Sequence, residues 1–136
     1  MTDTKWPKSL STITLFVEDL AATRQFYLDV FGLPVHFEDD SSAVFDFGNT
    51  LVNLLEVGQA PELVEPAPVG GPDVGPRCLL TVTVDDVDVA YERVRAAGVE
   101  LLNGPIDRPW GMRTACFADP DGHVWEVAQQ LQGGDE

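Results

Sequence analysis

A short segment occurs twice in the chain, and this internal repeat restricts the possible folds more than any other feature of the sequence. Residues 14–19, Thr-Leu-Phe-Val-Glu-Asp, match residues 81–86, Thr-Val-Thr-Val-Asp-Asp, with Val17 aligned on Val84. Each copy resembles a half-buried strand, and each ends in an aspartate that can cap a following helix. The 136-residue chain is therefore predicted to be a single domain built from two similar modules.

Both modules are predicted to have the element order β-α-β-β-β. Short alternating apolar runs indicate the strands, and apolar residues at helical spacing between an aspartate and a glycine indicate the helices. The first module comprises a strand at 10–17, a helix at 20–31 and strands at 34–38, 43–47 and 51–57. The second comprises a strand at 78–84, a helix from 86 to about 97 and strands at 99–103, 112–118 and 123–130.

Residues 58–77 join the two modules, which extend over about 10–57 and 78–130. The joint contains five prolines and four glycines without any periodicity, so no regular structure is expected there. A four-stranded sheet with one helix has only one covered face. The other face must meet water, a partner or a ligand, and we expect the functional site on these uncovered faces.

Glu126 is the most informative single residue of the second module. It follows a tight turn that Asp119-Pro120-Asp121-Gly122 would form, and it shares one face of a strand with Val124 and Ala128. The strand is otherwise suited to burial, and an unpaired buried charge is costly. Glu126 is therefore expected either to lie on an open sheet face or to be held there for a function.

The charge balance excludes some classes of partner. The chain has 23 acidic and 8 basic residues and a formal net charge of −15. Such a field repels nucleic acid and anionic membrane surfaces and attracts cations. No apolar run is long enough to span a bilayer and the N-terminus lacks a signal sequence, so a cytoplasmic location is expected. The spacing of Cys78 and Cys116 fits neither a zinc knuckle nor a redox motif, which predicts two reduced, buried thiols.

Several motifs, taken in order, resemble the vicinal oxygen chelate superfamily, which includes glyoxalase I, extradiol dioxygenases and bleomycin-resistance proteins. The resemblance covers roughly residues 10–130. It implies an α+β fold in which two βαβββ modules form a cupped, barrel-like mixed sheet with helices outside, usually in a homodimer. The motifs are Val17-Glu18-Asp19-Leu20 before Phe26-Tyr27 and Phe31-Gly32-Leu33; Val84-Asp85-Asp86-Val87; Pro109-Trp110-Gly111-Met112-Arg113; and residues 117–122 before Trp125-Glu126.

The resemblance also implies where metal-using members hold a divalent ion. Matched by motif, the four ligand places fall on Thr12, Asn53, Leu79 and Glu126. Glu126 is a good ligand, whereas Asn53 offers one neutral oxygen, Thr12 is a poor ligand and Leu79 offers nothing. We therefore expect no metal cofactor. A weakly held divalent ion belongs only to an alternative interpretation.

The histidines argue separately against extradiol dioxygenase chemistry. A non-haem iron site of that type needs two histidines and a carboxylate on one face of the metal. The chain has two histidines in total, His36 and His123, and neither falls at a ligand place. Both are expected to have surface or structural roles.

A ligand site without metal would be lined by Thr12, Thr14, Phe16, Asn53 and Glu126, with Trp110 and Arg113 in a nearby hairpin. Trp110 would either stack on the ligand or close the domain edge or a dimer contact. Arg113 would contact an acid of the ligand or pair with Glu126, or be a surface strand residue.

Three hypotheses follow for the function. The first is a metal-free protein that binds a small organic, possibly cationic molecule in a cup at a dimer interface, as the bleomycin-resistance type does. The second is a glyoxalase-like lyase or isomerase that uses Glu126 as general base, with or without a weak divalent metal supported by Asn53. The third is a partner-binding module whose cup is filled by its own side chains.

Overall fold

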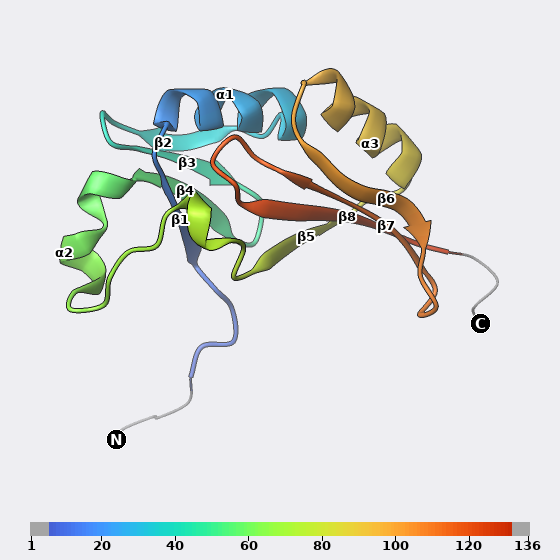
Figure 1. The fold of residues 1–136 in the computed structure, drawn as a ribbon. Helices are drawn as coiled ribbons and strands as arrows, with labels where there is room; N and C mark the ends of the chain where they lie inside the picture. Colours follow the sequence, from blue (N-terminus) through green and yellow to red (C-terminus); the bar gives the residue numbers. More distant parts are fainter. Residues whose placement is uncertain (1–5, 132–136) are drawn as a thin grey trace.

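The computed structural model describes residues 6–131, and these residues form two four-stranded sheets, each with one long helix (Figure 1). The first module contains β1 (Thr12–Val17), α1 (Leu20–Phe31), β2 (Val35–Glu38), β3 (Ser42–Asp46) and β4 (Leu51–Glu56). The second contains β5 (Leu79–Thr83), α3 (Val87–Ala96), β6 (Leu101–Asp107), β7 (Met112–Ala118) and β8 (Val124–Gln130). The predicted α+β class with two βαβββ modules is confirmed.

The two sheets have the same topology. The strand order is β1-β4-β3-β2 in the first sheet and β5-β8-β7-β6 in the second. In each, the first strand of the module lies at one edge and runs parallel to the last strand beside it, and the remaining pairs are antiparallel. Within residues 6–131 no strand ladder joins one sheet to the other. The halves are therefore held together by side chains.

Both long helices begin and end where the sequence signals predict. Asp19 Oδ1 accepts a hydrogen bond from the Ala22 N–H at 3.0 Å, and Asp86 Oδ1 accepts one from the Val89 N–H at 3.2 Å. Gly32 ends α1 in the left-handed conformation with φ of 61°, and its N–H donates to the last carbonyls of the helix. The capping aspartates of the repeat thus have matching roles in the two modules.

The joint between the modules differs from the expectation of an unstructured segment. It contains three short helical turns, η1 (Val57–Gln59), α2 (Pro61–Val64) and η2 (Pro72–Val74). Proline is compatible with the first turn of a helix because its missing N–H would have no partner there. Pro61 and Pro72 occupy this position in their turns.

The expectation of two buried cysteines is wrong for one of them. Cys116 is buried in β7, whereas Cys78 is exposed because it lies at the end of the joint, immediately before β5.

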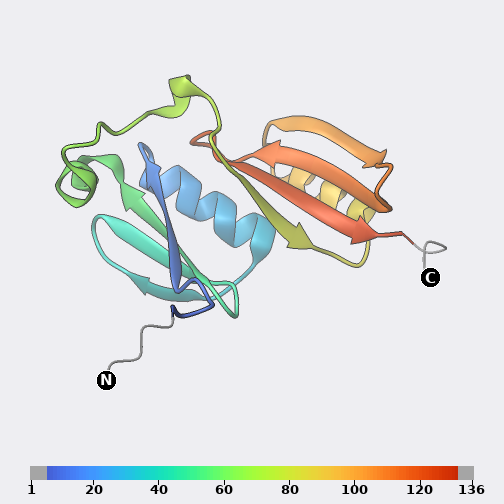
Figure 2. The ribbon, with the colours of Figure 1, turned by 90° about the horizontal axis from the view of Figure 1, so that it is seen from below.

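The helices lie on the same side of the two sheets, and the opposite sheet faces are uncovered (Figures 1 and 2). The core lies between the helices and the sheets and continues from one module into the other. Its centre is aromatic: Tyr27 and Phe31 of α1 pack against Trp125 of β8, with ring centroids 5.7 and 4.7 Å apart. Phe47 of the first module stacks on the same indole at 5.4 Å.

A chain of buried hydrogen bonds runs through this aromatic contact. Trp125 Nε1 donates to Tyr27 Oη at 2.9 Å, and the Tyr27 hydroxyl donates to Asp119 Oδ2 at 2.9 Å. The other oxygen of Asp119 accepts from the backbone N–H groups of Asp121 and His123. Burial raises the pKa of Tyr27 well above its ordinary value, and the Asp119 carboxylate raises it further.

The turn at 119–123 holds the first module at two further points. Asp121 Oδ2 accepts from the backbone N–H groups of Glu18 and Asp19, at 2.7 and 3.0 Å, where β1 leads into α1. His123 Nε2 is 2.9 Å from the Phe16 carbonyl oxygen. We call residues 119–123 the clasp, because they belong to the second module and bind the β1–α1 junction of the first.

Removal of the Tyr27 hydroxyl should test how much the clasp stabilises the fold. Tyr27→Phe leaves the Trp125 N–H and one Asp119 oxygen buried without partners, so the free energy of unfolding should fall by about 2–4 kcal/mol. Urea denaturation followed by tryptophan fluorescence measures the change. Tyr91→Phe is the matched control, because the Tyr91 hydroxyl forms no hydrogen bond within residues 6–131, and it should be near neutral. Equal effects of the two substitutions would contradict the assignment.

The stability should also depend on pH through Asp119. Burial raises the pKa of this carboxyl above its ordinary value of 3.8, so the folded state retains the proton at pH values where the unfolded chain has lost it. The free energy of unfolding should therefore fall as pH rises from that value through the folded-state pKa. Asp119→Asn should remove this part of the pH dependence. Urea midpoints of the native protein and of Asp119→Asn, measured between acidic and neutral pH, test this. A difference between the two midpoints that does not change with pH would disprove the assignment.

Candidate functional site

Glu126 lies on the uncovered face of the second sheet, near its centre. The strand register places Thr81 of β5 beside it on one side and Cys116 of β7 on the other. Thr81 Oγ1 donates to Glu126 Oε1 at 3.0 Å. Glu126 Oε2 has no hydrogen-bond partner within residues 6–131. The half-buried carboxylate is thus held in position by one oxygen and can accept from a ligand with the other.

Cys116 is next to this carboxylate but is unsuited to act as a nucleophile. Its side chain is only 8% exposed. Burial raises the pKa of the thiol above its ordinary value, and the negative charge of Glu126 raises it further. The thiolate is the reactive form of cysteine, so this thiol stays protonated and unreactive at neutral pH.

A cationic group lies on the same face, beyond Cys116. Arg108 Nε donates to Thr114 Oγ1 at 3.0 Å, and its Nη2 is 3.5 Å from Asn103 Oδ1. The guanidinium carbon is 5.9 Å from the centroid of the Trp110 ring, close enough for a cation–π contact. This face therefore presents a carboxylate and a guanidinium together with neutral polar side chains.

The predicted site residues of the first module lie together on the uncovered face of the first sheet. Thr14 and Asn53 are directly opposite each other in the parallel β1–β4 ladder, with Asn53 Nδ2 at 3.5 Å from Thr14 Oγ1. Asn53 Oδ1 is buried and has no hydrogen-bond partner within the described part of the chain. Phe16 and Thr12 follow the same alternation, so all four side chains share a face but lie on a different sheet from Glu126.

The two hairpin residues lie in different surroundings. Trp110 is 69% exposed at the loop between β6 and β7, beside Arg108. Arg113 lies on the helix side of the second sheet, where it pairs with Asp107 at 2.7 Å and with Asp88 at 2.9 Å. Arg113 therefore does not pair with Glu126, because the two side chains are on opposite faces of the sheet.

The side chains at the four implied metal-ligand places do not form a metal site. Thr12 and Asn53 lie on the first sheet, Glu126 lies on the second, and Leu79 offers no ligand atom. Over residues 6–131, no three or more His, Cys, Asp or Glu side chains are grouped so that they could hold a metal ion. These residues do not fit a resident divalent ion. That the protein has no metal cofactor stays a prediction.

Sequence reasoning missed Asn103, Arg108, Thr114 and Cys116. Alternation along β7 could have placed Thr114 and Cys116 on one face, but their position beside Glu126 depends on the β7–β8 register. Asn103 and Arg108 reach this face through an irregularity in β6 around Gly104. There a β-carbon would lie 2.5 Å from the Thr114 carbonyl oxygen, so glycine is required.

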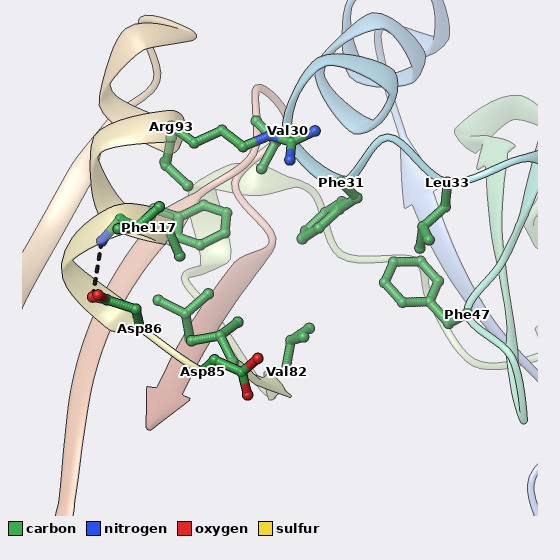
Figure 3. Close-up of a pocket in the computed structure, with 14 residues that line it drawn as sticks. Val30, Phe31, Leu33, Phe47, Val82, Asp85, Asp86, Arg93 and Phe117 are labelled. Carbon is green, nitrogen blue, oxygen red and sulfur yellow. Dashed lines mark hydrogen bonds between the residues drawn. The ribbon is translucent and has the colours of Figure 1, made fainter. Parts of the chain in front are cut away.

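Sequence reasoning also missed a cavity of about 560 Å³ on the other side of the sheets (Figure 3). It lies between the end of α1 and α3, and side chains of both modules line it.

Membrane insertion by a helix finds no support in the described residues, since none of their helices has the length and apolar character of a bilayer span. The cytoplasmic location stays a prediction.

Solved structures of other proteins are similar to the fold of this chain. A crystal structure of a glyoxalase/bleomycin resistance protein/dioxygenase from Nocardioides is 29% identical, with a TM-score of 0.81, over 97% of this chain and 89% of that one. A lactoylglutathione lyase from Agrobacterium tumefaciens is 25% identical with a TM-score of 0.73, over 96% of this chain and 100% of its own.

Sequence comparison supports the same grouping. The uncharacterized protein YraH of Bacillus subtilis is 35% identical over 127 residues, which cover 90% of this chain and 98% of that protein. The model of the Glyoxalase/Bleomycin resistance protein/Dioxygenase superfamily matches residues 9–127. The chain therefore belongs to this superfamily, the vicinal oxygen chelate family that its motifs resemble.

Proposed function

We propose that the protein binds a small organic molecule on the uncovered sheet faces, with Glu126 as its principal polar contact. The observation that carries this proposal is the geometry of the carboxylate: Thr81 holds one oxygen, and the other has no partner within residues 6–131. Threonine, asparagine and phenylalanine side chains of the first sheet add the mixed lining that is typical of small-molecule pockets.

A cationic or amine-bearing ligand fits this site best. An amine can donate a charge-assisted hydrogen bond to the free oxygen of Glu126. Arg108, the cation on this face, is already bonded to Thr114 and Asn103. The formal net charge of −15 also attracts cations to the protein.

A second copy of the chain would complete the binding cup. Apolar side chains are exposed on the uncovered faces, among them Phe37 at 55% and Leu79 at 50%. A partner that covered both faces would remove these apolar side chains from water. In the proposed homodimer, the first sheet of one copy faces the second sheet of the other, so that Asn53 and Glu126 of different copies approach the same ligand.

Glu126→Gln should weaken the binding of cationic ligands without unfolding the protein. Bleomycin and a panel of aromatic amines can be screened by thermal shift, and the dissociation constant of any hit measured by calorimetry. Loss of the charged hydrogen bond should raise that constant by about 10- to 100-fold. Glu62→Gln changes the net charge equally at an exposed position of α2 and should leave binding unchanged. Unaltered affinity of every cationic hit in Glu126→Gln would refute the role of this carboxylate.

A glyoxalase-like lyase or isomerase is the second candidate function. The free oxygen of Glu126 is suited to remove a proton from a carbon next to a carbonyl group and return it to the neighbouring carbon. Arg108, on the same face, would stabilise the negative charge on the substrate oxygen during the transfer. The similarity to the Agrobacterium tumefaciens lactoylglutathione lyase makes the hemithioacetal of methylglyoxal and glutathione the first substrate to examine.

The two candidates differ in turnover. An isomerase should form S-lactoylglutathione from this hemithioacetal, and Glu126→Gln should lower kcat by about 100-fold or more, whereas Glu62→Gln should retain full activity. Turnover that survives in Glu126→Gln would rule out the general-base role. A protein that binds no screened ligand and forms a homodimer with a filled cup would instead support the partner-binding alternative.

A further inference from the structure

The cavity on the helix side of the molecule is separate from the uncovered sheet faces. Phe31 and Phe47 of the first module and Val82 and Phe117 of the second line it (Figure 3). The remaining apolar lining comes from both modules: Val30, Leu33, Val84, Val89, Ala90, Val94 and Val127. A volume of about 560 Å³ lies within the range of pockets that bind small molecules.

Arg93 lies at the mouth of this cavity. Its side chain extends from α3 toward Val30 and the end of α1 (Figure 3). A β-carbon at Gly32 would lie 2.9 Å from an Arg93 guanidinium nitrogen. The guanidinium is therefore above the cavity, next to the C-terminus of α1, where a positive charge is favoured.

No acidic side chain pairs with Arg93 within residues 6–131, although the chain has 23 acidic and 8 basic residues. Arg24, Arg95 and Arg113 each form an ion pair with a carboxylate. The planar donors of arginine match a carboxylate in a bidentate geometry. Arg93 can thus offer its donors to a carboxylate that comes from outside the chain.

The two acidic residues of the cavity do not compete for the same place. Asp86 is engaged as the helix cap, through the Val89 N–H. Asp85 lies at the opposite end of the cavity from Arg93, beyond Val82 (Figure 3). A ligand with one negative end would therefore be oriented with that end at Arg93 and its apolar part among the phenylalanine rings.

We propose that this cavity is a second binding site, for an amphipathic monocarboxylate of the medium-chain fatty acid type. The carboxylate pairs with Arg93, and the alkyl chain occupies the space between the modules. Burial of the alkyl chain in this apolar lining favours binding and opposes the repulsion that an acidic protein exerts on an anion.

Calorimetry with decanoate and decylammonium, which share an alkyl chain and differ in charge, tests the proposal on the full-length protein. Decanoate should bind with one ligand per chain and more tightly than decylammonium. Arg93→Gln should weaken decanoate binding by about tenfold or more. Arg95→Gln, the matched control, removes an equal charge from an exposed position two residues further along α3, and should change the affinity by less than about twofold.

Two further variants keep the test decisive. Ala90→Phe should fill the cavity and abolish decanoate binding, whereas Glu126→Gln should leave it intact, because that carboxylate is on the opposite side of the sheets. Absence of decanoate binding to the native protein would overturn the proposal. Tighter binding of decylammonium, lost in Asp85→Asn and retained in Arg93→Gln, would overturn it too, because it would assign the cavity to cations.

Discussion

The hydrogen bonds among Trp125, Tyr27 and Asp119 are the interaction on which the rest of the structure depends. No strand ladder joins the two sheets within residues 6–131, so their relative position comes from side chains of the core and the clasp. A buried donor or acceptor without a partner is costly, and these three residues satisfy one another only in one arrangement of the modules. These polar contacts therefore specify how the two modules are placed relative to each other, while the surrounding aromatic rings supply most of the buried apolar surface.

The sequence predicted the modules well because their signals are local. Capping aspartates and closing glycines act within one turn of chain, and both long helices begin and end close to the predicted positions. The prediction for β6 ended too early. The strand continues to Asp107 because Gly104, with φ of 93°, accommodates an irregularity that appears in sequence as a strand end. The helical turns of the joint were missed because proline is common in loops and also fits the first turn of a helix, where Pro61 and Pro72 lie.

The site could be predicted only as far as strand alternation reaches. Strand alternation placed Glu126 on the uncovered face of the second sheet, and Thr14 and Asn53 on the uncovered face of the first. It could not show that Cys116 adjoins the carboxylate or that Arg108 folds back onto Thr114, because these contacts depend on register between strands distant in sequence. The helix-side cavity was beyond prediction, since it exists only through the packing of one module on the other.

The clasp occurs in the second module and has no equivalent among the described residues of the first, although the two modules have the same strand topology. In the first module, the corresponding hairpin at 47–50 is Phe-Gly-Asn-Thr, and the side chain of the adjacent Asp46 accepts a local hydrogen bond from the Gly48 N–H at 2.7 Å. The clasp side chains that bind the first module, Asp119, Asp121 and His123, thus all come from the second module. A chain with two first modules would keep both sheets and lose these hydrogen bonds between them. The two halves are therefore not interchangeable: they share their strand topology and capping aspartates, and they differ at the clasp.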